Sequence, residues 1–342
     1  MVLRPSFQTK KLWACLTNVY FYNVNWKFFL VVNLLLVVFQ GFSQVANPTF
    51  KTKYVYILVI DGPRYTETYG EPTCKYSPLL CDSLKKEGTF YANFKNNGPT
   101  FTVPGHTAIV TGNYQRISNS GTALPKQPNI FQYYLKATGK DPSKAYVVAS
   151  KGKLDVLVNT SHKKWNNQYL AETYCGPNGN GLGYGRDDKT FAKVTELVQS
   201  ENPPQLMLIN LLAVDVYGHA NNWDKYLESI TQSDLYAAKL WELIQSNPVL
   251  SNQTTLLITN DHGRHLDGVR SGFVNHGCWC EGCRHISLLV LGPDTPSGVV
   301  VTQEADMLDI SKTISEIMHF EMPTSKGKFL RAAFPANSNG LK

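Results

Sequence analysis

Seven residues whose side chains suit divalent metals or nucleophilic attack lie in five short segments of this 342-residue chain. They are Asp61, Thr102, Asp215, His219, Asp261, His262 and His276. Three of the segments immediately follow an apolar run that is typical of a buried strand. Carboxylates and imidazoles that project from strand ends into one crevice are what a two-zinc hydrolase needs. The set therefore predicts metal-assisted transfer of a phosphoryl-like group to a threonine.

The carboxylates differ in how strongly each one indicates a metal. Asp61 ends the run YVYILVID, where an aspartate that caps the following turn is the alternative. Asp215 and His219 are four residues apart, a spacing that places both on one face of a helix, although Gly218 favours a loop here. Asp261 and His262 are adjacent after LLITN, and a partly buried charge at that place needs a partner such as a metal.

Thr102 stands two residues before Pro104. Proline is favoured in the first turn of a helix, so Thr102 is predicted at a helix start, where the helix dipole stabilises an anion. Coordination to zinc would activate its hydroxyl as a nucleophile. The alternative is a simple N-cap, and Thr100 and Thr107 compete for the role on chemistry alone.

Short apolar strands that alternate with helices must position these side chains. The predicted strands are Tyr54–Ile60, Ala145–Ala149, Leu206–Leu212, Thr254–Thr259 and Ile286–Leu291. The predicted helices are Tyr76–Glu87, Pro104–Val110, Ile130–Thr138, Thr190–Ser200, Trp223–Ser246 and Ile310–Met318. The pattern predicts an α/β fold with a doubly wound, mostly parallel sheet, helices on both faces, and ligands at the carboxyl ends of the strands. Long loops at 151–188 and 263–284 read as insertions, the first as a small cap over the site.

The N-terminal residues favour export. The first 27 residues carry four basic side chains and no acid, and an apolar run, Phe28–Phe39, precedes small and polar residues. This predicts a secretory signal peptide over 1–44 and one catalytic domain over 45–342, in a periplasmic or secreted protein. The run is short for a membrane span of about 20 residues, so no span is expected in the mature chain. An uncleaved anchor is the alternative.

Charge and cysteines limit the partners and the compartment. The formal charge falls from +7 to +3 without the four basic residues of the predicted signal, so no nucleic-acid partner is expected. Outside that segment lie Cys74, Cys81, Cys175 and the cluster CWCEGC at 278–283. An even number in an exported chain favours disulfides, with Cys74 and Cys81 as a local pair. A small zinc site formed by the cluster and Cys175 is the alternative.

The ordered set Asp61, TVPGH, DVYGH, DHG and NHG resembles the alkaline phosphatase superfamily, from about Tyr54 to Pro293. Its branches most similar to this chain look like the nucleotide pyrophosphatase/phosphodiesterases and exported phosphatases with a threonine nucleophile. The resemblance implies one zinc on Asp215, His219 and His276, and a second on Asp61, Thr102, Asp261 and His262. It selects Thr102 from the T-x-P-x-H motif, and His276 over His285 because the family's last histidine precedes a glycine. It also implies a covalent phosphothreonine.

Three further residues resemble the family's phosphate-binding groups. Lys151 and Lys153 match a K-x-R segment, although lysine at the second position loses the bidentate geometry of arginine. A solvated loop is the alternative for both. Asn119 resembles the asparagine that follows the nucleophile helix, at a shorter spacing. Thr102 and His106 replace the Cys or Ser and the Arg of C/S-x-P-x-R, which argues against a formylglycine sulfatase.

These observations predict a metal-dependent hydrolase of small-molecule phosphate esters, either a phosphomonoesterase or a phosphodiesterase/nucleotide pyrophosphatase. Mixed histidine and aspartate ligands suit two zinc ions, with manganese or iron as alternatives. The other hypotheses are a phosphomutase of the same superfamily, a sulfate or phosphonate ester hydrolase, and a zinc-free binding protein on the same fold. Arg64 is expected in a surface salt bridge, and contact with the substrate is the alternative.

Overall fold

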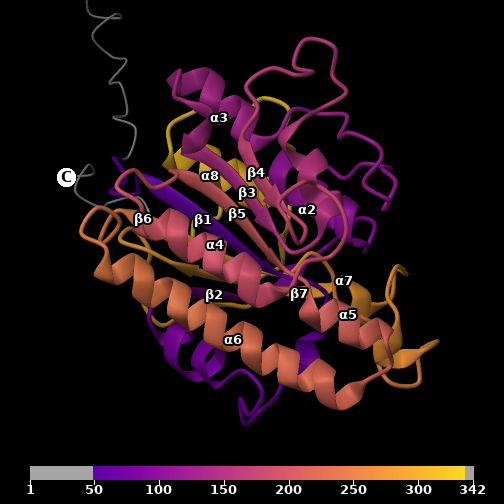
Figure 1. Cartoon of the computed structure of the whole chain (residues 1–342). Helices are drawn as coiled ribbons and strands as arrows, with labels where there is room; N and C mark the ends of the chain where they lie inside the picture. Colours follow the sequence, from indigo (N-terminus) through magenta and orange to yellow (C-terminus); the bar gives the residue numbers. More distant parts are fainter. Residues whose placement is uncertain (1–48, 336–342) are drawn as a thin grey trace, which may run out of the picture. The chain divides into compact units, whose positions relative to one another are not determined.

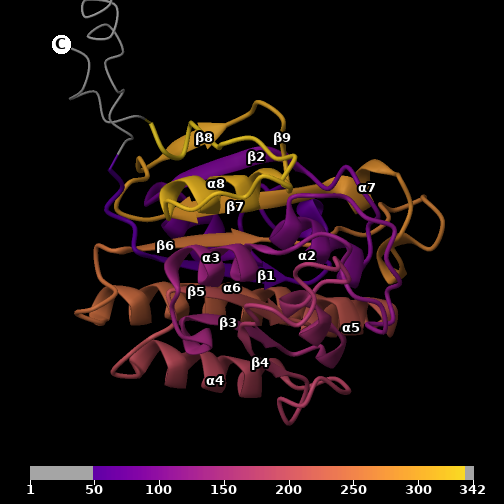
Figure 2. The same cartoon turned by 90° about the horizontal axis from the view of Figure 1, so that it is seen from above.

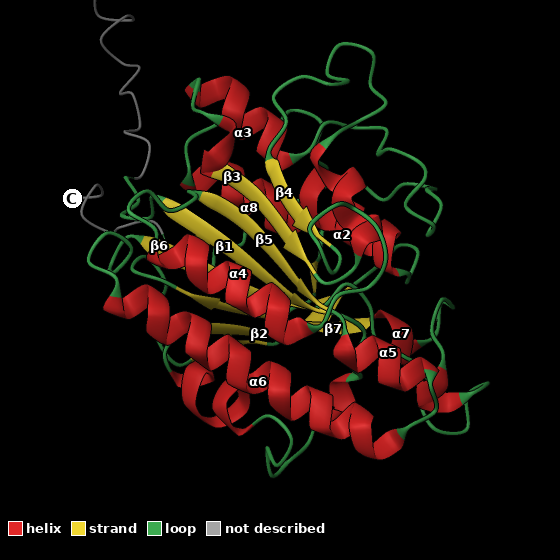
Figure 3. Ribbon diagram, viewed as in Figure 1, coloured by secondary structure: helices red, strands yellow, loops and turns green. Residues whose placement is uncertain are grey.

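The computed structural model describes residues 49–335, whose strands form one nine-stranded sheet between layers of helices (Figure 1, Figure 3). The predicted signal peptide lies outside the described residues. The strands are β1 (Tyr54–Ile60), β2 (Thr89–Lys95), β3 (Ala145–Ala149), β4 (Glu172–Cys175), β5 (Leu206–Leu211), β6 (Thr254–Thr259), β7 (His285–Leu291), β8 (Val299–Val301) and β9 (Ala305–Asp306).

The strand order is β4-β3-β5-β1-β6-β7-β2-β8, and β9 pairs with β2; Figure 2 shows this succession from above. Only β7 runs against its neighbours β6 and β2 among these strand pairs, and the others are parallel. The predicted mostly parallel, doubly wound sheet is confirmed. Since β1 lies between β5 and β6, the segments that follow these three strands meet at one edge of the sheet.

Both faces of the sheet are covered by helices. The α-helices are α2 (Thr102–Thr111), α3 (Ile130–Thr138), α4 (Asp187–Gln199), α5 (Ala213–His219), α6 (Trp223–Ser246), α7 (Glu281–Arg284) and α8 (Asp309–Ile317). Short helical turns are η1 (Tyr65–Glu67), η2 (Leu79–Ser83), η3 (Leu84–Lys86), η4 (Pro142–Lys144), η5 (Gly152–Val158) and η6 (Gly272–Val274). Helices α2, α3 and α8 pack on one face, and α4 and α6 pack on the other.

The central strand shows why the strands read as continuous apolar runs. Alternate residues of β1 enter opposite cores: Ile57 packs with α2, α3 and α8, whereas Leu58 packs with α4 and α6. Every residue of Val55–Ile60 is buried. A strand that is covered on both faces has no polar side to alternate with, which is the pattern of parallel sheets.

The structure also corrects parts of the sequence interpretation. The predicted helix Tyr76–Glu87 is helical only over Leu79–Lys86 and is irregular there, because a π-helix, η2, runs directly into a 3-10 helix, η3. The predicted disulfide between Cys74 and Cys81 is present and ties this segment together. The predicted loop 151–188 contains η5 and β4 and reaches the start of α4. Strands β2, β4, β8 and β9 were not predicted.

Within residues 49–335, no helix combines the length and the apolar character that crossing a membrane requires.

Candidate active site

The carboxyl ends of neighbouring strands bring the predicted metal-binding carboxylates together. Asp61 directly follows β1, Asp215 lies in α5 after β5, and Asp261 comes two residues after β6. The exposed fractions of these three residues are 0 %, 4 % and 0 %. Buried carboxylates are costly unless cations or hydrogen-bond donors compensate them. The fold therefore concentrates negative charge where the sheet edge meets α2.

Thr102 is the first residue of α2, and its side chain points into this cluster. Its Oγ1 lies 3.1 Å from Lys151 Nζ, and the residue is 1 % exposed. Gly105 allows the helix to come this close, because a Cβ there would lie 2.7 Å from the carbonyl oxygen of Asp261. The position at the helix N-terminus favours negative charge on Thr102 and on a group attached to it.

His106 and Asn210 lock the start of α2 to the sheet. His106 Nδ1 donates to the carbonyl oxygen of Thr102 at 2.9 Å, and its Nε2 accepts from Asn210 Nδ2 at 3.2 Å. The same amide of Asn210 lies 3.1 Å from Asp61 Oδ2. Asn210 lies in β5, where the sequence analysis saw only an apolar run. A polar residue inside an otherwise apolar strand was the signal that could have identified it.

Three buried polar atoms of one group have no hydrogen-bond partner among the described residues: Asp61 Oδ1, Asp261 Oδ2 and His262 Nε2. His262 Nδ1 donates to the carbonyl oxygen of Gly263 at 3.0 Å, which leaves the lone pair on Nε2. That nitrogen lies 3.3 Å from Asp261 Oδ2 and 3.7 Å from Asp61 Oδ1. Burial lowers the pKa of His262 to about 3, so the ring is a neutral acceptor that faces two acceptors. Such an arrangement fits a bound metal cation.

A second group of candidate ligands consists of Asp215, His219 and His276. His276 Nε2 lies 3.0 Å from His219 Nε2, and both nitrogens face Asp215 Oδ1, at 3.5 Å and 3.3 Å. His276 Nδ1 donates to the carbonyl oxygen of Thr100 at 2.7 Å, which again frees Nε2. Two imidazole nitrogens and a carboxylate oxygen that converge in this way fit a zinc-like cation. His285, the rejected alternative to His276, bonds instead to the carbonyl oxygen of Ala92.

Lys151, predicted to contact phosphate, lies among the carboxylates. Its Nζ is 2.6 Å from Asp215 Oδ2 and 2.9 Å from Asp61 Oδ2. Burial opposes the charge on Lys151, but the surrounding carboxylates outweigh burial and raise its pKa. Burial likewise opposes ionisation of Asp215, yet Lys151 holds the pKa of that carboxyl well below its usual range. For Asp61, burial and the charge of Asp261 prevail and raise the pKa to about 6.

The other two residues of the predicted phosphate-binding set lie at the start of α2. Asn119 Oδ1 accepts from the backbone N–H of Val103 at 2.9 Å and from Lys153 Nζ at 3.2 Å. Burial, followed by the charge of Lys151, lowers the pKa of Lys153. The structure therefore brings Asn119, Lys151 and Lys153 together around Thr102, although they come from different segments.

Arg264, which was not predicted from the sequence, forms a buried ion pair with Asp215. Its guanidinium bonds to Asp215 Oδ1 at 2.6 Å, to the carbonyl oxygen of Val274 at 2.9 Å and to that of Phe273. Gly218 makes room for it, because a Cβ there would lie 2.6 Å from the Arg264 Cζ. The prediction that Gly218 indicates a loop was wrong. Asp215 and His219 lie on a helix, α5, and the glycine is needed for space.

Asp187 also holds the site together and was not predicted. Its carboxylate accepts from the backbone N–H groups of Leu212 and Ala213 at 2.8 and 2.9 Å, at the start of α5. The hydroxyl of Ser150 donates to it at 2.7 Å. Asp187 thus fixes the helix that carries Asp215 relative to the segment that carries Lys151.

Arg64 was predicted in a surface salt bridge. It does form salt bridges, but the residue is buried and not at the surface. The residue is 2 % exposed, and its guanidinium pairs with Glu67 at 2.7 Å and with Asp267 at 2.7 Å. The pair with Asp267 joins the segment after β1 to the segment after β6. Arg64 therefore supports the site instead of lying at the surface.

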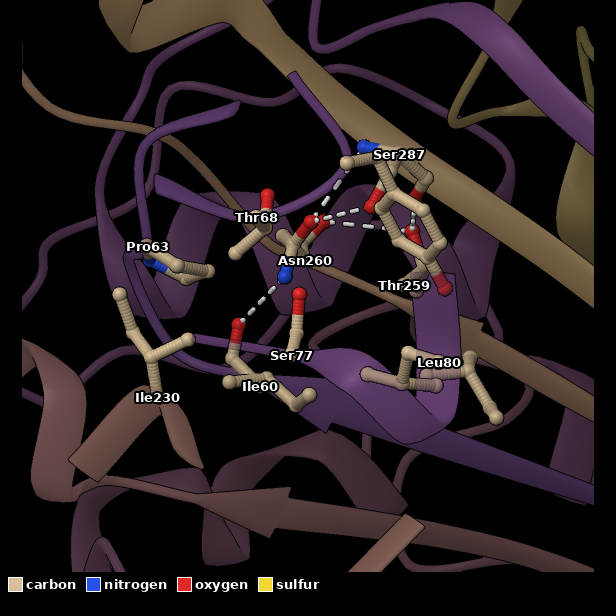
Figure 4. Close-up of a pocket in the computed structure, with 11 residues that line it drawn as sticks. Ile60, Pro63, Thr68, Ser77, Leu80, Ile230, Thr259, Asn260 and Ser287 are labelled. Carbon is tan, nitrogen blue, oxygen red and sulfur yellow. Dashed lines mark hydrogen bonds between the residues drawn. The ribbon is translucent and has the colours of Figure 1, made fainter. Parts of the chain in front are cut away.

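A small pocket lies behind the site and is not a place for substrate (Figure 4). Asn260 Nδ2 donates there to the carbonyl oxygen of Ile60 at 3.1 Å, and Ser287 Oγ donates to Asn260 Oδ1 at 2.9 Å. The volume of about 20 Å³ has room for little more than a water molecule. Asn260 thus ties the ends of β1, β6 and β7 just before Asp261.

The sheet and the helices that cover it have the fold of the alkaline phosphatase superfamily. Within it, the model of the type I phosphodiesterase / nucleotide pyrophosphatase family matches residues 55–265, and the chain belongs to this family. The prediction of a hydrolase that acts on phosphoric esters is confirmed at this level. Members of the family are metallo-enzymes, which agrees with two groups of candidate ligands here: Asp61, Asp261 and His262, and Asp215, His262 and His276. A search of curated proteins found no match.

Solved structures support the fold. A protein of the alkaline phosphatase superfamily from Vibrio parahaemolyticus matches with a TM-score of 0.58 at 16 % identity, over 83 % of this chain and 71 % of that one. The phosphonate monoester hydrolase of Agrobacterium radiobacter matches with a TM-score of 0.61 at 12 % identity, over 82 % and 77 %. An inactive variant of murine ectonucleotide pyrophosphatase / phosphodiesterase 5, in complex with AMP, matches with a TM-score of 0.59 at 14 % identity, over 81 % and 97 %.

Proposed function

We propose that this chain is an exported hydrolase of small-molecule phosphoric esters, with Thr102 as the nucleophile and two zinc ions as cofactors. One zinc is assigned to Asp61, Thr102, Asp261 and His262, and the other to Asp215, His219 and His276. The observation that carries the proposal is the position of the Thr102 hydroxyl, which is buried at a helix start and lies 3.1 Å from Lys151 Nζ. That ammonium in turn contacts the carboxylates of Asp61 and Asp215. Bound zinc ions would supply Lewis-acid activation of the hydroxyl and neutralise charge on the phosphoryl group.

The side chains of this chain perform the remaining work. Thr102 Oγ attacks phosphorus, the ester oxygen leaves with the alcohol, and water then cleaves the phosphothreonine to release phosphate and restore the hydroxyl. The start of α2 stabilises the phosphoryl oxygens through its dipole. Asn119 and Lys153, which meet 3.2 Å apart beside the first turn of α2, are placed to donate to those oxygens. Lys151 balances the buried carboxylates of Asp61 and Asp215.

The proposed substrate class follows from these donors. Two lysines and an amide near Thr102 suit the dianion of a phosphate monoester, whereas the phosphodiesterase / nucleotide pyrophosphatase family suits nucleotide diesters. Measurement of the turnover of an aryl phosphate monoester and of the matching aryl diester, with zinc, distinguishes the two. Absence of turnover of both, in protein that contains zinc, would contradict the proposed function. The predicted signal over 1–44 and the domain over 45–342 belong to the same proposal, and N-terminal sequencing of the exported protein tests them.

The nucleophile is tested by a matched pair of substitutions in α2. Thr102→Val and Thr107→Val each remove one hydroxyl and keep the volume, and Thr107 Oγ1 is buried without a partner within the described range. We expect Thr102→Val to lower kcat/KM by about 10³-fold or more, because a transition-state interaction is lost, and Thr107→Val to keep activity within about threefold. Acid quenching of the wild type during turnover should trap a phosphothreonine at Thr102. Equal activity of the two variants would exclude Thr102 as the nucleophile.

A further inference from the structure

A second group of metal-binding side chains lies in the segment between β6 and β7, outside the active site. It consists of His265, Cys278, Cys280 and Cys283, and we call it the cysteine–histidine cluster. One ring nitrogen of His265 and the three sulfur atoms all lie within 4.8 Å of one another. Cys175, which the sequence analysis joined to these cysteines, lies instead in β4 with its Sγ 3.8 Å from the carbonyl oxygen of Val147. His265 takes the place predicted for Cys175.

The ring of His265 has a buried lone pair without a partner. The residue is 3 % exposed, and Nδ1 has a contact of 3.4 Å with Ser271 Oγ. Nε2 is buried and has no hydrogen-bond partner among residues 49–335. With Nδ1 protonated toward Ser271, Nε2 is an acceptor that is removed from water, which is costly unless a ligand binds it. Metal-binding histidines commonly bond through the other ring nitrogen in this way.

The sulfur positions fit a tetrahedral metal. Cys278 Sγ and Cys283 Sγ are 3.7 Å apart. Zinc with bonds of about 2.3 Å to sulfur in tetrahedral geometry separates its sulfur ligands by about 3.8 Å, whereas a disulfide requires about 2.05 Å. The backbone N–H of Cys280 lies 3.3 Å from Cys278 Sγ, where it stabilises a thiolate. Four ligands, three thiols and one imidazole, complete a closed coordination shell of the structural type.

We propose that His265, Cys278, Cys280 and Cys283 bind one structural zinc ion, separate from the two assigned to the active site. A disulfide is the competing chemistry, since Cys74 and Cys81 form one in this chain. A disulfide within the cluster would leave one thiol and the His265 lone pair unused, whereas one zinc uses all four groups.

The position of the zinc gives it a role in supporting the active site. In the sequence, His276 lies between His265 and the three cysteines of the cluster. The backbone N–H of Gly263, the residue after His262, donates to the carbonyl oxygen of Cys283 at 2.9 Å. The hydroxyl of Thr100, two residues before Thr102, donates to the carbonyl oxygen of Cys278 at 3.0 Å. Gly282 lies so close to Arg264 that a Cβ would approach its carbonyl oxygen to 2.4 Å. The zinc thus clamps the segment from which His276 reaches Asp215.

Cobalt substitution of the full mature protein tests the proposal without any mutation. Cobalt in the cysteine–histidine cluster should give a strong near-ultraviolet thiolate-to-metal charge-transfer absorption. The active-site groups contain no sulfur and cannot produce this band. X-ray absorption at the zinc edge should show zinc–sulfur bonds of about 2.3 Å. Absence of both signals, together with a mass two hydrogens lower and a peptide cross-linked through Cys278 and Cys283, would overturn the proposal in favour of a disulfide.

Two sets of variants separate this zinc from the catalytic metals. The Asp261→Asn variant should lose catalytic metal and activity but keep one sulfur-bound zinc per chain. If both this variant and the wild type lack the sulfur-bound zinc, the structural zinc proposal fails while the proposed function stands. Cys280→Ser should lose the charge-transfer band, whereas Cys175→Ser, the matched control outside the cluster, should keep it. Cysteine variants with equal bands would contradict the assigned ligands. Retained zinc with no ester hydrolysis in the wild type would instead remove the proposed function alone.

Discussion

The active site and the cysteine–histidine cluster assemble metal ligands in opposite ways. The active site collects oxygen and nitrogen atoms from Asp61 to His276, across β1, α2, α5 and the segment after β6. The cluster collects sulfur and nitrogen atoms from residues 265–283, within a single connection between β6 and β7. The first site therefore depends on the whole sheet, whereas the second needs only one loop.

This difference decides what each metal contributes to the protein. The active-site carboxylates lie in a framework already fixed by Asn210, Asp187 and Arg264, and Lys151 balances part of their charge. The metals proposed for this site would therefore serve chemistry more than folding. The segment 263–284 has little regular structure beyond η6 and α7, so the free energy of metal binding there is available to order the loop. We expect chemistry to follow the first site and local stability to follow the second.

The largest effect is expected from removal of the active-site metals. Brief treatment with a chelator should lower ester hydrolysis by at least about 10³-fold, because the electrostatic stabilisation of the transition state is lost. Added zinc should restore it. The open active site should release its metals before the closed cysteine–histidine cluster does. Metal analysis alongside activity should therefore find inactive protein that still contains about one zinc per chain.

Circular dichroism of that inactive protein provides the control. Its helix signal should stay unchanged, because Lys151 and Arg264 still compensate Asp215. Unfolding at the moment when activity disappears would show that the sheet itself depends on the catalytic metals. The proposed contrast between the two sites would then be wrong.

The next effect concerns Arg264, which connects the two regions. Arg264→Lys keeps the charge but cannot reach Asp215 and two carbonyl groups at once, since lysine lacks the planar fork of arginine. Leaving partners of a buried ion pair unsatisfied should cost about 3 kcal/mol in the free energy of unfolding. Chemical denaturation of the zinc-loaded wild type and variant measures this difference in the free energy of unfolding.

Arg186→Lys is the matched control, because Arg186 makes a two-pronged pair with Asp188 at the surface. The side chain of Arg186 is 80 % exposed, and the change should leave the free energy of unfolding nearly unchanged. Similar costs for both substitutions would mean that the geometry of Arg264 does not support Asp215.

The sequence predicted most of the active-site residues but not the full membership of the cysteine–histidine cluster. Local sequence signals were enough for the first and not for the second. Strand ends and helix starts are local features, so β1, β5, β6 and Thr102 could be placed from apolar runs and a proline. The partners of the cysteines could not, because only the fold shows that His265 and not Cys175 lies beside them. The disulfide between Cys74 and Cys81 was predictable, since its loop is short.

Supporting residues escaped prediction because their role depends on contacts between distant segments. Asn210 lies inside an apolar strand, and the contact of Arg264 with Asp215 joins residues 49 positions apart in the chain. Gly218 was interpreted from backbone propensity, whereas its role is to leave space for Arg264. Strands β4, β8 and β9 have at most four residues each, too few to show a period.

The smallest expected effect belongs to Lys153, which should influence substrate and leave stability unchanged, the opposite of Arg264. Lys153→Met keeps the aliphatic stem and removes the charge that lies beside Asn119. Loss of one charge-assisted hydrogen bond, about 1.5–3 kcal/mol, should lower kcat/KM for an aryl phosphate monoester by about 10- to 100-fold. The matching diester carries less negative charge and should lose less. Lys164→Met, on an exposed residue, is the control. Equal losses on both esters would mean that Lys153 only holds Asn119 in place, and any preference for monoesters would then have to come from Lys151.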